Sequence, residues 1–402
     1  MRVRVLAAAV LLFALSAGAA GAGSGSLHAR LAGTFRLAGV DSASSTAMVV
    51  ELPTGRVVFA RNADLSLEPA SNEKLSVTYA ALVELGPSYR WPTEVLGEGR
   101  RVGSTWQGRL ILKGFGDPTL TTADLRRLVG ILWRMGIRRV TGGIAGDASA
   151  FDAKRVADGW LPSFEGIESP PLSALVVDRA ARKGKIVADP TLAAAARFDR
   201  LLRLRGIVAR SASVRTAGRD AVPLATVYSE PLSEVLEFMD RWSDNFTAEM
   251  VLKTIGYKTL GQGTTAAGAA VTFRDLDSAG VPVAGVRIAD GSGLSRDDRV
   301  TARELTALLV KMWNDPEMRE IVWKALPVAG VSGTMRHRLL DASNHLHLRA
   351  KTGTTDIASA LSGYVGSRFA FVAIENGHPV NYWAAHAAED GVAKALLAEL
   401  GH

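Results

Sequence analysis

Cysteine is absent from this chain of 402 residues, and long apolar runs occur only near its start. Without cysteine there is no disulfide, no catalytic thiolate and no cysteine-ligated metal site. The 7 histidines lack metal-ligand spacing such as H-E-x-x-H. His345 and His347 are expected to alternate on one face of a surface strand. Neither a metal nor an organic cofactor is expected.

The N-terminal segment has the pattern of a secretory signal peptide. Arg2 and Arg4 precede an apolar run at residues 5–15, and residues 17–22 offer Ala-x-Ala cleavage sites. This run is too short for a transmembrane helix, which needs roughly 18 to 20 apolar residues, and no later stretch reaches that length. We expect residues 1–22 to be removed and the protein to act in the periplasm, the cell envelope or the medium. An uncut anchor helix is the alternative.

Composition and charge limit the classes of partner. The chain is 48% hydrophobic and 22% charged, which is typical of a globular protein, and it is long enough for a large core and two domains. Its net charge of +7 is scattered rather than gathered in a basic run with aromatic residues, so nucleic acid is not an expected partner. At most a peripheral membrane association is expected. The sequence does not indicate an oligomeric state.

A serine and a lysine stand three residues apart where a helix is predicted to begin. Apolar residues recur at helical spacing from Leu75 to the stop signal Gly86-Pro87. Residues i and i+3 share a helix face, so the Lys74 amine can reach the Ser71 hydroxyl. A neutral amine in that place can take the serine proton and create a nucleophile. Alone the pattern is weak, since Ser71 could simply be a helix N-cap.

Two later motifs strengthen this interpretation. Ser-Asp-Asn at residues 243–245 lies between two helical patterns, and Lys-Thr-Gly at 351–353 lies on a predicted strand. Each is ordinary by itself, and the first could be a plain N-cap. Together, and in this order after a signal peptide, the three motifs resemble the signature set of penicillin-binding proteins and serine β-lactamases.

Within that superfamily the chain resembles the D-alanyl-D-alanine carboxypeptidases and endopeptidases of the penicillin-binding protein 4 type, peptidase family S13. The resemblance covers nearly the whole mature chain, and D-G-S-G-L-S-R at 290–296 is its most specific stretch. A class A β-lactamase would show a deacylating glutamate after Ser243, whereas the candidates Glu165 and Glu168 precede it. The segments that carry the resemblance are 69–86, 116–120, 169–178, 243–245, 290–296, 326–331 and 350–354.

The resemblance implies an α/β (α+β) fold with a transpeptidase-like domain. Its mainly antiparallel sheet flanked by helices is expected to be formed by residues 28–88 and 225–402. A smaller inserted α+β domain is expected at residues 89–224. The family's further nested domain is expected to be missing, because the interval from Ser71 to Ser243 is short. Periodicity predicts strands at 47–52, 56–60, 109–113, 142–147, 213–216, 222–228, 358–365 and 368–374, and helices at 71–86, 125–132, 231–241, 248–255 and 382–400.

The resemblance also implies a reaction on peptidoglycan stem peptides ending in D-Ala-D-Ala, with β-lactams as covalent inhibitors. Two alternatives remain open, a serine β-lactamase and a non-catalytic wall-peptide receptor or scaffold. The implied roles are Ser71 as nucleophile, Lys74 as base, Ser243 as proton relay and Asn245 as holder of the substrate amide. The substrate carboxylate is implied to be received by Lys351, Thr352, Gly353 and Thr354. The N–H groups of Ser71 and Thr354 are implied to form the oxyanion hole.

Overall fold

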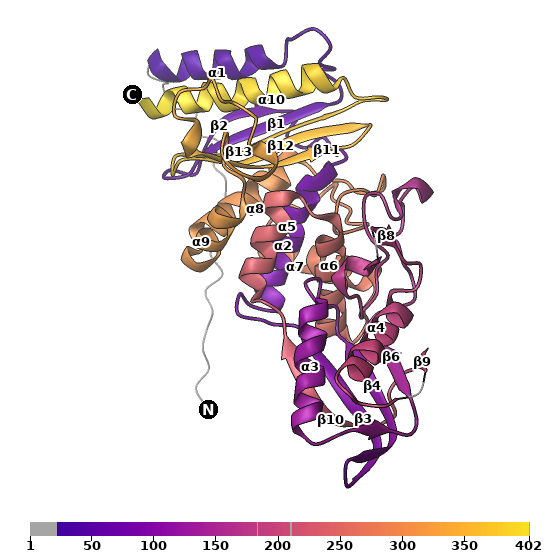
Figure 1. Ribbon diagram of the computed structural model, residues 1–402. Helices are drawn as coiled ribbons and strands as arrows, with labels where there is room; N and C mark the ends of the chain where they lie inside the picture. Colours follow the sequence, from indigo (N-terminus) through magenta and orange to yellow (C-terminus); the bar gives the residue numbers. More distant parts are fainter. Residues whose placement is uncertain (1–21, 183, 210, 402) are drawn as a thin grey trace, which may run out of the picture.

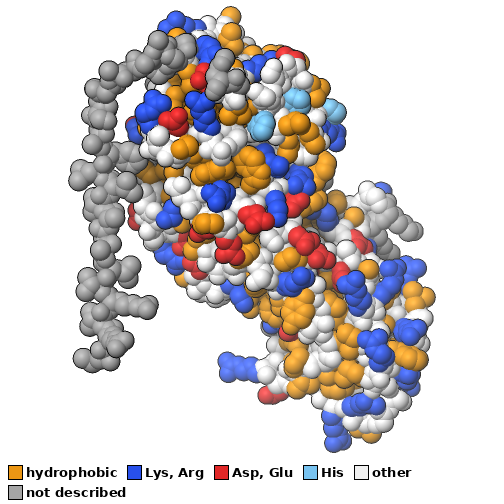
Figure 2. All heavy atoms as spheres, turned by 90° about the vertical axis from the view of Figure 1, so that its left-hand side faces the viewer, with side chains coloured by type: hydrophobic (Ala, Val, Ile, Leu, Met, Phe, Trp, Pro, Cys, Tyr) orange, Lys and Arg blue, Asp and Glu red, His pale blue; other side chains and the backbone are white. Residues whose placement is uncertain are grey.

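A computed structural model describes residues 22–182, 184–209 and 211–401 (Figure 1). The signal-peptide prediction falls almost wholly on residues outside this range. Among the described residues, no helix combines the length and apolar character needed to cross a membrane. On the face drawn in Figure 2, Lys and Arg side chains are spread over both lobes of the molecule rather than gathered in one patch.

The larger lobe is built on a five-stranded antiparallel sheet with helices on both faces. Helices α1 and α10 cover one face, and α2, α5, α6, α7, α8 and α9 lie on the other side (Figure 1). The strand order is β11 (Leu348–Thr354), β12 (Ala358–Val365), β13 (Phe369–Asn376), β1 (Ser45–Glu51) and β2 (Arg56–Arg61). The helices are α1 (Ala22–Thr34), α2 (Lys74–Glu84), α5 (Leu232–Trp242), α6 (Asn245–Leu260), α7 (Thr265–Ser278), α8 (Ala302–Asn314), α9 (Pro316–Ala325) and α10 (Tyr382–Leu397).

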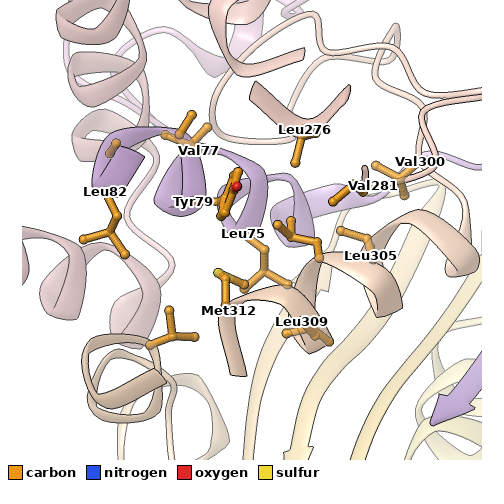
Figure 3. Close-up of a cluster of buried hydrophobic side chains, with 14 of the residues drawn as sticks. Leu75, Val77, Tyr79, Leu82, Leu276, Val281, Val300, Leu305, Leu309 and Met312 are labelled. Atoms are coloured by element: carbon orange, nitrogen blue, oxygen red, sulfur yellow. The ribbon is translucent and has the colours of Figure 1, made fainter. Parts of the chain in front are cut away.

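Helix α2 runs through the centre of this lobe and is buried on all sides from Lys74 to Leu82. Leu75 and Tyr79 point into an apolar cluster together with residues of α7 and α8, such as Leu276 and Leu309 (Figure 3). Fully burying one such side chain contributes about 1.5 to 3 kcal/mol. The start of α2, which carries the serine–lysine pair, is therefore fixed against both the sheet and the helical layer.

The smaller lobe contains a second sheet, in the order β10-β3-β4-β6-β9 with β5 beside β4. Helices α3 and α4 pack together on this sheet around Leu128 and Phe198. The chain leaves the larger lobe after α2 and returns to it at α5. The elements are β3 (Pro92–Val102), β4 (Thr105–Gly114), α3 (Thr122–Arg134), β5 (Arg139–Val140), β6 (Ile144–Asp147), β7 (Ala181–Arg182), β8 (Lys185–Ile186), α4 (Pro190–Leu204), β9 (Ala212–Val214) and β10 (Val222–Tyr228).

The fold class predicted from the sequence is confirmed: an antiparallel sheet flanked by helices in an α+β protein. One local prediction is wrong. His345 and His347 do not alternate on a strand, because they form a 3-10 turn and β11 begins only at Leu348. In the larger lobe, helices α1, α7, α8 and α9 had not been predicted, and α8 packs directly on β1 and β13.

Candidate active site

Ser71 and Lys74 lie at the junction of a 3-10 turn (Ala70–Glu73) and helix α2. The Ser71 side chain makes no capping hydrogen bond, so the alternative of a simple N-cap is wrong. Instead the Lys74 Nζ atom lies 2.9 Å from Ser71 Oγ. Lys74 is completely buried, and bulk water therefore does not compete for this contact. The pair has the geometry of a nucleophile beside its base.

Two carbonyl oxygens hold the Lys74 amine in place. Nζ donates to Asn245 Oδ1 at 2.9 Å and to the Ser292 carbonyl at 2.6 Å. Carbonyl oxygens can only accept hydrogen bonds. In the neutral amine the two N–H groups serve these oxygens, and the lone pair is left for the Ser71 hydroxyl. The surroundings thus orient a neutral lysine as a base.

The loop at 290–296 supplies that carbonyl, a role that the sequence did not predict. Its buried Asp290 accepts hydrogen bonds from the backbone N–H groups of Gly293, Leu294 and Ser295, at 2.6 to 3.1 Å. Gly293 has φ +78°, and a Cβ there would lie 1.8 Å from the Ala70 carbonyl. The loop can therefore lie against the serine turn only with glycine at this position.

Ser243 and Lys351 form a second serine–lysine pair in the same region. Ser243 joins α5 to α6 with a left-handed backbone, φ 56° and ψ 42°. Lys351 Nζ donates to Ser243 Oγ at 2.8 Å and to the Thr352 carbonyl at 2.8 Å. The Thr352 hydroxyl in turn bonds the Thr334 hydroxyl at 2.7 Å. Strand β11 therefore presents its lysine directly to the Ser-Asp-Asn motif.

Asn245 and Asp244 make contacts of different kinds. Asn245 Nδ2 donates to the Glu168 carbonyl at 3.1 Å, so the contact of Glu168 with this motif is through its main chain. Asp244 caps α6 by accepting from Thr247 N at 2.8 Å, and it is paired with Arg179.

Burial shifts the pKa values of both lysines. It lowers the pKa of Lys74 to about 8, and the nearby carboxyl groups of Asp290 and Glu249 limit this fall. Burial also lowers the pKa of Lys351 well below its usual value, and the charge of Lys74 lowers it further. A lysine that receives the substrate carboxylate must carry a charge, and the carboxylate of a bound substrate would itself raise the pKa of Lys351.

The structure brings the predicted catalytic residues together through two lysines. Lys74 links Ser71 to Asn245, and Lys351 links Ser243 to β11. A Cβ on Gly353 would lie 3.0 Å from Ser71 N, so β11 runs directly past the nucleophile, with Thr354 exposed next to it. A hollow beside Ala70 is lined by residues 293–296 and 355–357 and by Phe164 of the smaller lobe.

This arrangement defines a class of protein, the serine acyl-transfer enzymes with the penicillin-binding fold. Residues 29–185 and 180–398 match the D-Ala-D-Ala carboxypeptidase 3 (S13) family. The chain therefore belongs to that family.

Several relatives support the assignment. A D-alanyl-D-alanine carboxypeptidase of Actinomadura sp. (strain R39) is 31% identical over 90% of this chain and 83% of its own length. A carboxypeptidase of Mycobacterium tuberculosis is 31% identical over 82% of this chain and 76% of its own. Among solved structures, penicillin binding protein 4 from Haemophilus influenzae has a TM-score of 0.81 at 21% identity and covers 93% of this chain and 99% of its own. A predatory peptidoglycan endopeptidase from Bdellovibrio bacteriovorus has a TM-score of 0.55 at 17% identity and covers 85% of this chain and 87% of its own.

Proposed function

We propose that this serine carboxypeptidase removes the terminal D-alanine from peptidoglycan stem peptides through an acyl-enzyme on Ser71. The observation that carries the proposal is the 2.9 Å contact between Ser71 Oγ and a fully buried Lys74 amine. The carboxypeptidase activity of the relatives supports the same reaction.

Acylation begins when the Ser71 hydroxyl attacks the carbonyl of the penultimate D-alanine and gives its proton to Lys74. The backbone N–H groups of Ser71 and Thr354 stabilise the oxyanion, and losing one such donor typically costs about 2.7 to 4 kcal/mol in the barrier. Ser243, linked to Lys351, relays this proton from Lys74 to the leaving nitrogen, so that Lys74 is neutral again and D-alanine departs as its free amine. Water then attacks the ester, which releases the shortened peptide and restores the Ser71 hydroxyl.

Binding follows from the groups that surround the nucleophile. Lys351 receives the terminal carboxylate together with Thr352, Thr354 and the backbone at Gly353. Asn245 holds the substrate amide, and for this its Nδ2 must exchange the Glu168 carbonyl for a substrate carbonyl. None of these steps requires a metal or an organic cofactor.

β-Lactams should acylate Ser71 in the same way, as penicillin G acylates a predatory endopeptidase of Bdellovibrio bacteriovorus. We test this with a fluorescent penicillin: the wild type should be labelled and Ser71→Ala should not. No labelling of a folded wild type would favour a wall-peptide receptor or scaffold. Rapid loss of the label, within seconds rather than minutes to hours, would favour a β-lactamase.

The balance between carboxypeptidase and endopeptidase activity is measured on purified wall polymer. Release of free D-alanine marks the first activity, and release of uncross-linked fragments marks the second. We further propose that residues 1–22 direct export to the periplasm or the cell envelope. Sequencing the N-terminus of the exported protein tests this, because an intact Met1 would contradict cleavage.

A further inference from the structure

The middle residue of the Ser-Asp-Asn motif, Asp244, has no part in the proposed reaction but is bound from the smaller lobe. Arg179 Nη1 lies 3.1 Å from Asp244 Oδ1, and Nη2 lies 2.8 Å from Oδ2. The guanidinium also stands 4.8 Å from the centre of the Phe246 ring. We propose that Arg179 is a positioning residue for acylation, which fixes Asp244 and thereby its neighbours Ser243 and Asn245. The inference rests on the proposed function.

The backbone of the motif needs such support. Ser243 adopts left-handed φ and ψ values, which are unfavourable for a residue with a side chain. The main chain of the two flanking helices holds the next residue: Asp244 N donates to the Met239 carbonyl at 2.9 Å, and Asp244 Oδ1 accepts from Thr247 N. The bidentate guanidinium adds a directional contact from the smaller lobe. A strained conformation persists only where its surroundings determine it fully.

Arg179 is itself held in a fixed turn. Asp178, Arg179 and Ala180 have φ values of 48°, 54° and 57°, three consecutive left-handed residues of which none is glycine. Asp178 Oδ1 accepts from Thr122 N at 2.9 Å, and Asp178 also forms an ion pair with Arg197 of α4. The arginine is thus presented to Asp244 from a turn anchored on α3 and α4.

The two neighbours of Asp244 explain why this contact matters for the chemistry. Ser243 is bonded to Lys351, and Asn245 is bonded to Lys74, so a shift of the motif changes the surroundings of both lysines. A displacement of about 1 Å at a reacting group can cost on the order of 100-fold in rate. Arg179 touches neither lysine and acts only through Asp244 and Phe246.

The test measures the second-order rate constant for acylation by a fluorescent penicillin, together with the thermal midpoint. We expect Arg179→Ala to lower the rate about 10- to 100-fold with little change in the midpoint, because the ion pair is partly exposed. Arg179→Lys keeps the charge but loses the two-pronged guanidinium, so its acylation rate should lie between those of the wild type and Arg179→Ala. The matched control is Arg127→Ala, which removes an exposed ion pair with Asp124 on α3 and should leave the rate unchanged.

Asp244→Asn completes a double-mutant cycle. Asparagine caps helices as well as aspartate, so this change removes the ion pair and keeps the cap. In the Asp244→Asn background, Arg179→Ala should have less than about a twofold further effect. The inference is overturned if Arg179→Ala acylates at the wild-type rate. It is also overturned if Arg179→Ala lowers the rate as much in the Asp244→Asn background as in the wild type. If Arg179→Ala does not fold, the same cycle is measured with Arg179→Lys in place of Arg179→Ala. A wild type that is not labelled refutes the proposed function instead.

Discussion

The Thr78 hydroxyl donates a 2.8 Å hydrogen bond to Asp240 Oδ2, which joins helix α2 to helix α5 in the buried centre of the site. Thr78 lies one turn after Lys74, and Asp240 lies one turn before Ser243. Burial raises the pKa of Asp240 to about 6, and the charges of Lys351 and Lys74 oppose this rise. Asp240 is therefore mostly ionised at neutral pH and is a countercharge for both lysines.

Asp240→Asn should shift the pH profile of acylation toward acid. Without the anion, both lysines lose a stabilising partner for their charged forms, so Lys74 becomes neutral at lower pH. We expect the apparent pKa of the acylation rate to fall by about one unit and the affinity for anionic substrates to weaken. Thr78→Val, which keeps the carboxylate, is the control and should move the profile less. An unchanged profile in Asp240→Asn would show that the lysines do not depend on this charge.

Gly353→Ala should damage the oxyanion site without unfolding the protein. An added Cβ would lie 2.9 Å from the Pro69 carbonyl and 3.0 Å from Ser71 N, which displaces the nucleophile's own N–H group. Loss of one oxyanion donor costs roughly 100- to 1,000-fold in rate, and we expect a drop of that order in penicillin labelling. Gly33→Ala is the matched control, since nothing lies within 4 Å of its Cβ position. Equal labelling of the two variants would contradict the role of this backbone.

Much of the site could be predicted because its signals are local. A serine and a lysine three apart on a helix, and a lysine on a strand, each carry a pattern within a few residues. The groups that surround and orient these residues have no such local signal. The Ser292 carbonyl that orients Lys74 is a main-chain atom, and only the D-G-S-G-L-S-R stretch around it pointed to importance.

Contacts between distant segments were missed for the same physical reason. Arg179 meets Asp244 only because two lobes pack together, and a left-handed turn without glycine has no sequence signature. Helix α8 was missed although Thr301 caps it, and its buried Glu304 runs against the usual apolar pattern of a core helix. His345 and His347 were misplaced because alternation over three residues does not distinguish a strand from a 3-10 turn.

The division into domains at residues 89–224 can be tested by deletion. Phe246 and Met250 of α6 are fully buried, and they pack against Phe151 and Leu172 of the smaller lobe. Removing residues 90–220 would expose this surface, and large exposed apolar patches promote aggregation. We expect insoluble protein, measured as the soluble fraction beside the full chain. A soluble truncation that still reacts with penicillin would show that the larger lobe is independent.

Glu304→Gln should stabilise the protein at high pH. Burial raises the pKa of Glu304 to about 8, and among the described residues its carboxyl has no hydrogen-bond partner. The folded state therefore holds this proton more tightly than the unfolded state, and its contribution to stability is lost as pH rises from about 4.5 toward 8 and beyond. The variant should gain roughly 1 to 3 kcal/mol in the free energy of unfolding at pH 9.

Denaturant unfolding at pH 5 and pH 9 measures this effect. The gain from Glu304→Gln should be small at pH 5, where the wild-type carboxyl is protonated as well. Glu317→Gln, a change at an exposed site on α9, serves as control and should show no such difference. An equal effect of Glu304→Gln at both pH values would mean that the carboxyl is not protonated in the folded protein.

Lys74 and Lys351 should respond differently to substitution by arginine. Arginine cannot lose its proton in a protein, so Lys74→Arg should abolish acylation while the fold survives. Lys351→Arg keeps a cation for the substrate carboxylate and should retain part of the activity.

In the wild type, the acylation rate should rise with pH through an apparent pKa near 8. Burial lowers the pKa of Lys74 to about 8, and only its neutral form accepts the Ser71 proton. That value belongs to the coupled pair of lysines rather than to Lys74 alone. Stopped-flow labelling between pH 6 and 9 measures it. Equal rates in Lys74→Arg and the wild type, with no dependence on pH, would exclude Lys74 as the base.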